Sequence, residues 1–255
     1  MNGLIGSTGF VGGNLARQGP FDVTCHRPDV DVIDGRSFDL LVCAGAPGEK
    51  WRANAAPEPD LANLETLMSH LDKASARRFV LISTIDVYPS PAGVDETTPI
   101  DRDAGAPYGR HRLMLEDFCT SRFARCLVVR LPALFGPGLK KNFVFDLLAG
   151  RNQHLTHHAS AFQYYDVRRL WEDLRVAMDA GLTLLNVATE PLRADRIAAE
   201  LTQDPFDNVT DAGPVSYDMR TIHSSVWGAE PPYLQSAGEV LERLRTWAAS
   251  ERASA

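Results

Sequence analysis

The feature that most constrains this chain is a repeated alternation of short, predominantly apolar segments with segments of helical spacing. The apolar runs, each typical of a strand buried in a sheet, lie at residues 4–5, 21–25, 39–44, 78–83 and 127–131. Between them, residues 61–71 and 108–123 have the spacing of amphipathic helices. The alternation predicts a parallel sheet with helices on both faces, which is a doubly wound α/β fold.

A glycine-rich turn directly follows the first apolar run. Gly6, Gly9 and Gly12 have the spacing G-x-x-G-x-x-G, and helical spacing resumes at Val11 and Leu15. Glycine leaves room for a pyrophosphate to approach the free N–H groups at the start of a helix. The turn therefore predicts a nucleotide site in a Rossmann-like sheet. The alternative is merely a tight strand–helix turn.

The residues expected to bind the dinucleotide extend beyond these glycines. They are Gly6, Thr8, Gly9, Phe10, Val11, Gly12, Arg27, Ala44, Gly45, Ser83 and Pro132. The second strand ends in His26 and Arg27, where a carboxylate would select NAD by binding the ribose. A guanidinium suits a 2′-phosphate instead, so we expect NADP as the cofactor, with NAD as the second choice. The alternative for Arg27 is a solvated turn residue.

The segment Gly136–Gly138 marks the point where the chain is expected to leave the nucleotide fold. We expect a dinucleotide-binding domain over residues 1–138, with a strand near 183–188 returning to its sheet. Residues 139–255 are expected to form mainly a small, mostly helical substrate-binding lobe. A closing helix over 237–249, which could also pair subunits into a homodimer, has one face formed by Val240, Leu241, Leu244 and Trp247.

Several segments in a fixed order carry a family resemblance: Gly6 to Gly12, Thr84 to Tyr88, Tyr108 to Arg112, and Arg130 to Gly138. With them the chain resembles the extended short-chain dehydrogenase/reductases, the NAD(P)-dependent epimerase/dehydratase family. The marks of that family are Gly-x-x-Gly-x-x-Gly, Ser/Thr-x-x-Val-Tyr, Tyr-x-x-x-Lys and Arg-x-Pro-x-x-x-Gly-Pro-Gly. The resemblance spans nearly the whole chain. It implies an NAD(P)-dependent oxidoreductase or epimerase that acts on a carbonyl or hydroxyl carbon of a nucleotide-linked sugar.

The resemblance implies a catalytic set of Tyr108, Thr84 and Arg112. A tyrosine with its usual pKa of about 10 needs a nearby cation to act as a base on the reacting oxygen. Residues four apart share a helix face, so Tyr108 and Arg112 could address one nicotinamide ribose, while Thr84 would hydrogen-bond the reacting oxygen. The plainer alternatives are a helix-start tyrosine, a strand-end hydroxyl bonded to backbone, and a salt-bridged surface arginine.

Position 112 departs from the family, because it holds Arg where the family has Lys. Arg keeps the positive charge, but its guanidinium hardly deprotonates, so a proton passes through it less easily. Ala133 also replaces the Asn that many nucleotide-sugar members carry. The arginine favours an alternative function, a dinucleotide-binding regulator or redox sensor with the same fold and little or no turnover.

The residues expected to bind the substrate are Asp86, Val87, His111, Lys140 and Asn142. Lys140 and its neighbour Lys141 would hold a substrate phosphate, and the alternative is a solvated basic corner. His111 equally suits an exposed helix position. The nearby histidines at 154, 157 and 158 lack a matching carboxylate or cysteine cluster, so no metal site is expected.

Composition excludes some partners. The formal net charge is −7, with 26 Lys and Arg against 33 Asp and Glu, so no nucleic-acid partner is expected. No apolar stretch approaches about 20 residues and the first residues lack a signal-peptide pattern, so no membrane partner is expected either. The four cysteines lie in apolar runs without C-x-x-C spacing, which favours core thiols in the reducing cytoplasm.

Overall fold

The computed structural model describes residues 1–202 and 204–254. The chain divides into two compact units, each assembled from separated segments. The first unit comprises Met1–Ser90, Thr97–Arg130 and Leu170–Leu185, and the second comprises Pro91–Glu96, Leu131–Arg169 and Asn186–Ala255. The chain thus crosses from one unit to the other at Arg130, and α6 (Leu170–Asp179) returns to the first.

Six strands of the described chain form one sheet in the order β10-β6-β4-β3-β1-β2. Their bounds are β1 Asn2–Ile5, β2 Val23–Cys25, β3 Ser37–Cys43, β4 Ser75–Thr84, β6 Cys126–Leu131 and β10 Leu184–Asn186. Strand β1 pairs in parallel with both β2 and β3, and β3 pairs in parallel with β4. The predicted parallel sheet and the return of a strand near 184 are therefore confirmed.

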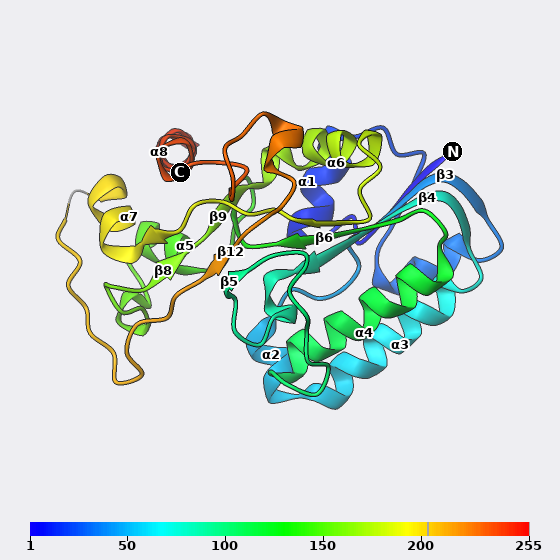
Figure 1. The fold of residues 1–255 in the computed structure, drawn as a ribbon, viewed down its shortest axis with the longest axis horizontal. Coiled ribbons are helices and arrows are strands. Elements are labelled where there is room, and N and C mark those ends of the chain that lie inside the picture. The colour runs from blue at the N-terminus through cyan, green and yellow to red at the C-terminus, as the bar shows by residue number, and fades with distance from the viewer. Residues whose placement is uncertain (203, 255) are drawn as a thin grey trace. The chain divides into compact units, whose positions relative to one another are not determined.

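Helices cover both faces of this sheet, as the alternation predicted. Helix α1 (Phe10–Gln18) and α6 lie on one face, and α3 (Pro57–Leu71) and α4 (Pro107–Arg122) lie on the other (Figure 1). Helix α3 turns Leu64, Leu67 and Leu71 into the core, at the spacing that the sequence displays. The fold is Rossmann-like and doubly wound.

Among the helices that were not predicted from the sequence, two short ones lie near the candidate site. They are η1 (Arg27–Ile33), a 3-10 helix that follows β2, and α2 (Lys50–Ala55), which precedes α3. Neither has an apolar periodicity long enough to predict a helix, because six or seven residues make fewer than two full α-helical turns. Both elements contribute side chains to the candidate site described below.

The second unit combines helices with short strand pairs. Its helices are α5 (Phe143–Leu148), α7 (Ala194–Leu201) and α8 (Ala237–Ser254), and its strand pairs are β5 (Ala92–Val94) with β12 (Asp218–Met219), β7 (Ala133–Phe135) with β9 (Tyr164–Asp166), and β8 (Ala161–Phe162) with β11 (Leu192–Arg193). The predicted apolar face of the closing helix is confirmed, because Val240, Leu244 and Trp247 are buried.

A half-buried carboxylate, that of Glu96, joins distant segments of the second unit. Glu96 accepts hydrogen bonds from the backbone N–H of Asn186 at 2.8 Å and from that of Ile222 at 3.0 Å. It also accepts one from the Thr221 hydroxyl at 2.6 Å. The segment that carries Glu96 is therefore held to residues about a hundred positions further along the chain.

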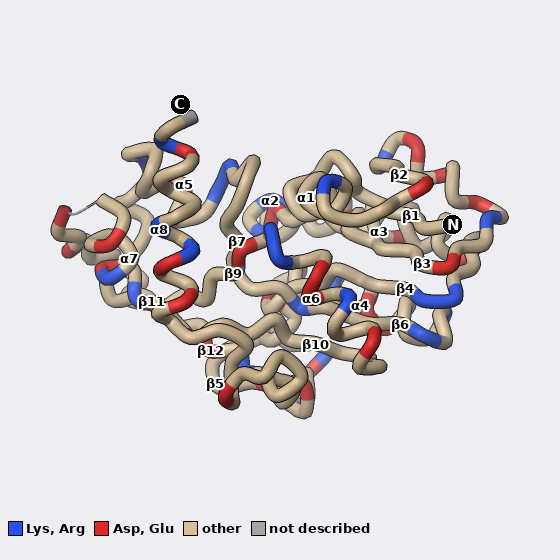
Figure 2. Tube along the Cα trace, turned by 90° about the horizontal axis from the view of Figure 1, so that it is seen from above, with Lys and Arg blue, Asp and Glu red and all other residues tan. Residues whose placement is uncertain are grey.

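Charged residues of both signs are interspersed along the described chain in both units (Figure 2). None of the described helices has the length and apolar character needed to cross a membrane. All four cysteines are free and buried, as the sequence predicted. Burial raises the pKa of the Cys43 thiol to about 12, so this sulfur stays protonated and packs as a core group.

The first unit also buries an ion pair beneath α4. Arg130 on β6 contacts Glu116 on α4 at 2.6 Å, and their side chains are only 7% and 5% exposed. Arg130 also donates to the Tyr88 hydroxyl at 2.7 Å, and Ser83 donates to Glu116. Each charge is thus matched by a partner, which is the condition for burying it at tolerable cost.

Removing one member of this pair is expected to leave an uncompensated buried charge. We expect Glu116→Gln to lower the free energy of unfolding by about 3 kcal/mol, measured by urea denaturation. The control is Asp117→Asn on the same helix, which breaks the exposed ion pair of Asp117 with Arg102, a residue before the helix. It should cost under about 1 kcal/mol. Equal costs for both variants would contradict a stabilising role for the buried pair.

Candidate active site

The carboxyl edge of the sheet is shaped by two backbone approaches at the glycine turn. Strand β2 lies on one side of β1 and β3 on the other, so the strand order reverses here, and a ligand crevice forms at such a point. Gly6 has φ +88°, and a Cβ on it would lie 2.3 Å from the Ala44 carbonyl oxygen. A Cβ on Gly12 would lie 2.1 Å from the Gly6 carbonyl oxygen. Only glycine fits at either position, as the sequence suggested.

The start of α1 offers unfilled hydrogen-bond donors. Gly9 is the N-cap, so no side chain caps the first N–H groups, and the described first turn holds no acidic residue. Thr8 is exposed, and Phe10 and Val11 are half-buried beside it. The free N–H groups and the positive end of the helix dipole together make a site for an anion such as a pyrophosphate.

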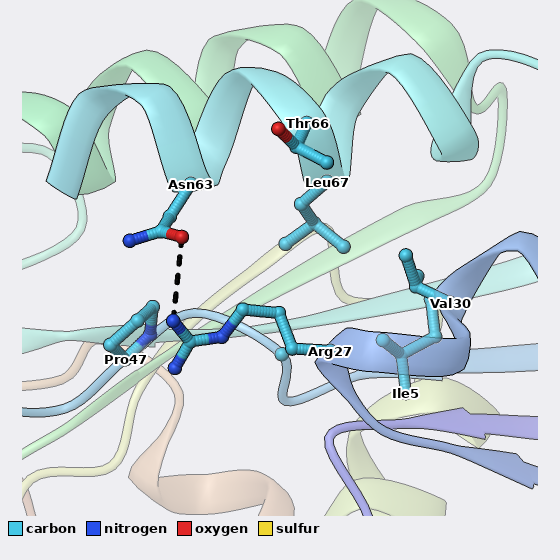
Figure 3. Close-up of a pocket in the computed structure, with 8 residues that line it drawn as sticks. Ile5, Arg27, Val30, Pro47, Asn63, Thr66 and Leu67 are labelled. Atoms are coloured by element: carbon cyan, nitrogen blue, oxygen red, sulfur yellow. Dashed lines mark hydrogen bonds between the residues drawn. The ribbon is translucent and has the colours of Figure 1, made fainter. Parts of the chain in front are cut away.

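A small pocket lies between β1, η1 and α3, which we call the Arg27 pocket (Figure 3). Its lining residues are Ile5, Arg27, Val30, Gly45, Pro47, Asn63, Thr66 and Leu67. The Arg27 side chain extends along the pocket and donates to Asn63 at 3.4 Å. The first carboxylate after β2, Asp29, accepts from the backbone N–H of His26 at 2.8 Å and thereby caps η1.

Tyr108 lies at the beginning of α4, where glycine again permits a close approach. A Cβ on Gly109 would lie 2.0 Å from the Asp86 carbonyl oxygen, so the helix start packs directly on the backbone that follows β4. The backbone N–H of Tyr108 donates to Asn54 of α2 at 3.0 Å. This packing brings Tyr108 near enough to Thr84 for that residue to act on the pKa of the phenol.

Arg112 is held on the same face of α4 as Tyr108. Its guanidinium carbon lies 4.4 Å from the centre of the Tyr108 ring. Two of its nitrogens donate to the two carboxylate oxygens of Asp60 at 2.9 Å each, and one donates to the Pro47 carbonyl at 2.6 Å. The Arg112 and Asp60 side chains are 3% and 6% exposed. The Nε of Arg112 is buried and has no hydrogen-bond partner among the described residues.

These surroundings determine the protonation of both groups. Burial acts to raise the pKa of Asp60, but hydrogen bonds from Arg112 and His111 outweigh it, so the pKa lies below its usual value. Burial raises the pKa of Tyr108 above its usual value. The charge of Arg112 opposes that rise in pKa, Asp86 adds to it, and Thr84 opposes it.

Asp86 and Lys50 form a second ion pair near the phenol. The Lys50 ammonium lies 2.6 Å from the Asp86 carboxylate, and their side chains are 45% and 19% exposed. The backbone N–H of Asp86 donates to the Thr84 hydroxyl at 3.2 Å. The predicted residues Thr84, Asp86 and Tyr108 are therefore brought together, while Val87 and Ser83 are buried beside them.

Sequence reasoning missed several residues that shape this site, namely Lys50, Asn54, Asp60 and Gly109. One signal was available for Asp60. It lies four residues before Leu64 and seven before Leu67, on the apolar face of α3, where a carboxylate needs a partner. His111 was predicted to face the substrate, and its Nδ1 lies 2.8 Å from Asp60.

The other predicted site residues belong to the second unit. Pro132 is buried and Lys140 is exposed. Asn142 caps α5, because its side-chain oxygen accepts from Phe145 N–H at 3.1 Å, and its amide donates to the Leu134 carbonyl at 2.8 Å. Among the described residues, no group of three or more His, Cys, Asp or Glu is placed to hold a metal ion.

Comparison with known proteins identifies the family. A sequence model described as the NAD dependent epimerase/dehydratase family matches residues 22–179, which is more than half of the chain. A search of the curated proteins finds no match. The matched segment includes Thr84, Tyr108 and Arg112. The glycine turn lies before residue 22 and so outside the match.

Solved structures with the same fold cover nearly the whole chain. MoeE5 in complex with UDP-glucose and NAD is 16% identical, with a TM-score of 0.76 and 99% of both chains covered. A UDP-galactose 4-epimerase is 19% identical, with a TM-score of 0.72 and 97% of both chains covered. The dTDP-4-dehydrorhamnose reductase from Yersinia enterocolitica is 13% identical, with a TM-score of 0.72 and coverage of 97% and 98%. By its matched sequence and its fold, the chain belongs to the NAD dependent epimerase/dehydratase family and is an NAD-dependent enzyme of the oxidoreductase type.

Proposed function

We propose that this protein interconverts a carbonyl and a hydroxyl group on a nucleotide-linked sugar, as a ketosugar reductase or an epimerase, with NADP as its preferred cofactor. The observation that carries the proposal is the packing of the start of α4, which holds Tyr108, against the backbone that follows Thr84 at the carboxyl end of β4. A phenol and a hydroxyl at that place can together bind and protonate one reacting oxygen.

The residues present fit a dinucleotide. The glycines at 6 and 12 leave a cradle that any Cβ would fill, and the start of α1 offers N–H groups to the pyrophosphate. The buried, unpartnered Nε of Arg112 would take a ribose hydroxyl as its acceptor. A bound nicotinamide dinucleotide would supply the hydride acceptor or donor for the reacting carbon.

The roles of the side chains follow from their placement. Tyr108 exchanges its phenolic proton with the substrate oxygen, and Thr84 holds that oxygen by a hydrogen bond. Arg112 binds the ribose, and its guanidinium lies over the Tyr108 ring. Asp86 is exposed enough to accept hydrogen bonds from sugar hydroxyl groups. Lys140 would attract the diphosphate of the substrate.

Loss of the phenolic hydroxyl is expected to abolish turnover. Tyr108→Phe should lower kcat by about 10²- to 10⁴-fold, because the proton donor is removed. The measurement is reduction of a dTDP-linked 4-ketohexose, followed by the loss of NADPH absorbance. NADPH binding to the same variant, measured by fluorescence, serves as the control for folding. Turnover that survives in Tyr108→Phe would contradict the assigned role.

Two substitutions at one position separate the hydroxyl of Thr84 from its shape. Thr84→Val keeps the shape and removes the hydroxyl, so kcat is expected to fall by about 100-fold. Thr84→Ser keeps the hydroxyl and should retain most of the activity in the same assay. If the two variants were equally active, the hydroxyl would have no part in the reaction.

The preference for NADP rests on the end of β2. Arg27 lines the Arg27 pocket, and the nearest following carboxylate, Asp29, is engaged by His26. A guanidinium that pairs with the 2′-phosphate contributes about 1.5–3 kcal/mol as a charge-assisted hydrogen bond.

The cofactor preference can be tested at this arginine. Arg27→Met is expected to weaken NADPH binding about tenfold or more and to leave NADH binding nearly unchanged, as measured by fluorescence titration. The control is Arg36→Met, because Arg36 precedes β3 and so lies at the amino end of the sheet. Tighter binding of NADH than of NADPH by the unmodified protein would overturn the preference.

The nucleotide-sugar substrate class is supported by the proteins of similar fold, among them the MoeE5 complex with UDP-glucose. We also propose a cytoplasmic location, in keeping with four buried reduced thiols. Assembly into a homodimer remains a prediction.

A second function is favoured by one observation. Arg112 stands where the family has Lys, and its charge is neutralised by Asp60. A protein with this arrangement could retain dinucleotide binding and serve as a regulator or redox sensor with little turnover. Binding of NADPH without any activity on a panel of UDP- and dTDP-linked sugars would favour this alternative.

A further inference from the structure

The charges that act on Tyr108 are each opposed by a partner. The Arg112 guanidinium lies over the Tyr108 ring, and Asp60 accepts two hydrogen bonds from Arg112 at 2.9 Å each. Asp86 also acts on the phenol, and Lys50 lies 2.6 Å from its carboxylate. The groups that face the phenol from α2, α3, α4 and the segment after β4 therefore nearly cancel in charge.

Asp60 determines where the charge of Arg112 can act. The two side chains meet through paired parallel hydrogen bonds, which fix the plane of the guanidinium as well as its distance. The Pro47 carbonyl also accepts a hydrogen bond from Arg112, and the imidazole of His111 contacts Asp60 Oδ2, which accepts from Arg112 as well. Because the pair is buried, water screens it little, and the carboxylate cancels much of the cation's field.

We propose that Asp60 is a positioning residue that keeps the Tyr108 phenol protonated: by neutralising Arg112 and holding it on the Tyr108 ring, it prepares the site to protonate a carbonyl oxygen, as the reduction of a ketosugar requires. This inference rests on the proposed function. A free cation beside the phenol would favour the phenolate, which is the base needed to begin oxidation of an alcohol. Here the cation is compensated, and the proton is retained for donation.

The reductive step balances as follows. The substrate carbonyl carbon gains a hydride from the reduced nicotinamide dinucleotide, which is oxidised, and the carbonyl oxygen gains the phenolic proton of Tyr108. One C–H and one O–H bond form on the substrate, while its C=O π bond, the Tyr108 O–H bond and one C–H bond of the reduced nicotinamide break. The phenolate left on Tyr108 takes a proton from solvent. This step requires Tyr108 to carry its proton at neutral pH, which agrees with the raised pKa of its phenol.

The protonation of Tyr108 can be measured without any substrate. The chain has six tyrosines, and NMR of tyrosine labelled at the hydroxyl-bearing ring carbon reports each phenol, with the Tyr108→Phe spectrum assigning the signal. In the unmodified protein, the Tyr108 signal is expected to titrate at higher pH than that of an exposed tyrosine. In Asp60→Asn, the uncompensated guanidinium should make Tyr108 ionise at least about one pH unit lower, a tenfold change in the equilibrium constant.

Two further variants distinguish charge from structure. Asp72→Asn breaks the Asp72–Arg122 pair, 3.0 Å long, which joins the far ends of α3 and α4. It should leave the Tyr108 titration unchanged. The double variant Asp60→Asn with Arg112→Gln removes both charges and should restore the titration of the unmodified protein. A double variant that titrated as low as Asp60→Asn would indicate a loosened site and would overturn the proposal.

Other results are equally decisive. Ionisation of Tyr108 near neutral pH in the unmodified protein would refute the proposal even if Asp60→Asn fails to fold. An unchanged titration in a folded Asp60→Asn protein would do the same. Because the titration needs neither substrate nor turnover, either failure leaves the proposed function standing. Conversely, full activity of Tyr108→Phe would remove the proposed function while leaving the titration intact.

Discussion

Backbone segments that approach too closely for any side chain define the reactive edge of this molecule. At Gly6 and Gly12 they bring the start of α1 against the ends of β1 and β3, and at Gly109 they bring the start of α4 against the backbone after β4. Each approach aims a helix start at the carboxyl edge of the sheet. The anion-binding N–H groups of α1 and the phenol of Tyr108 both depend on these contacts, because a Cβ at any of the three positions would push the helix away.

The parallel sheet, its covering helices and the returning strand near residue 184 could be predicted because their signals are local. Apolar periodicity marks each strand and long helix, and glycine marks the turn at Gly6. The same reasoning found Tyr108 and Thr84, since ordered motifs identify them. It could not find Asn54 or Lys50, which lie on α2, a helix too short to have a readable stripe. Their roles arise from contacts with residues more than thirty positions away.

Asp60 illustrates a different limit. Its place on the apolar face of α3 shows that the carboxylate needs a partner, but the sequence does not say which one. The partner is Arg112, fifty-two positions later, and the pair explains how an arginine can occupy this place in a buried site. An arginine without Asp60 would leave a buried charge, and Asp60 without the arginine would do the same. The effects of substitutions at the two positions are therefore coupled. Removing one charge alone lowers stability by leaving the other buried without a partner, whereas removing both charges together does not leave one behind.

The bonds that converge on Glu96 bear on how the polypeptide acquires its structure during synthesis. The donors of its hydrogen bonds belong to Asn186, Thr221 and Ile222. The Glu96 carboxylate therefore cannot accept these bonds until most of the chain has left the ribosome. The first unit likewise lacks α6 until residue 179 is made. The first unit thus needs the chain up to Leu185, and the second needs segments both before and after that point. A single cut in the chain therefore cannot separate them into two independently complete fragments.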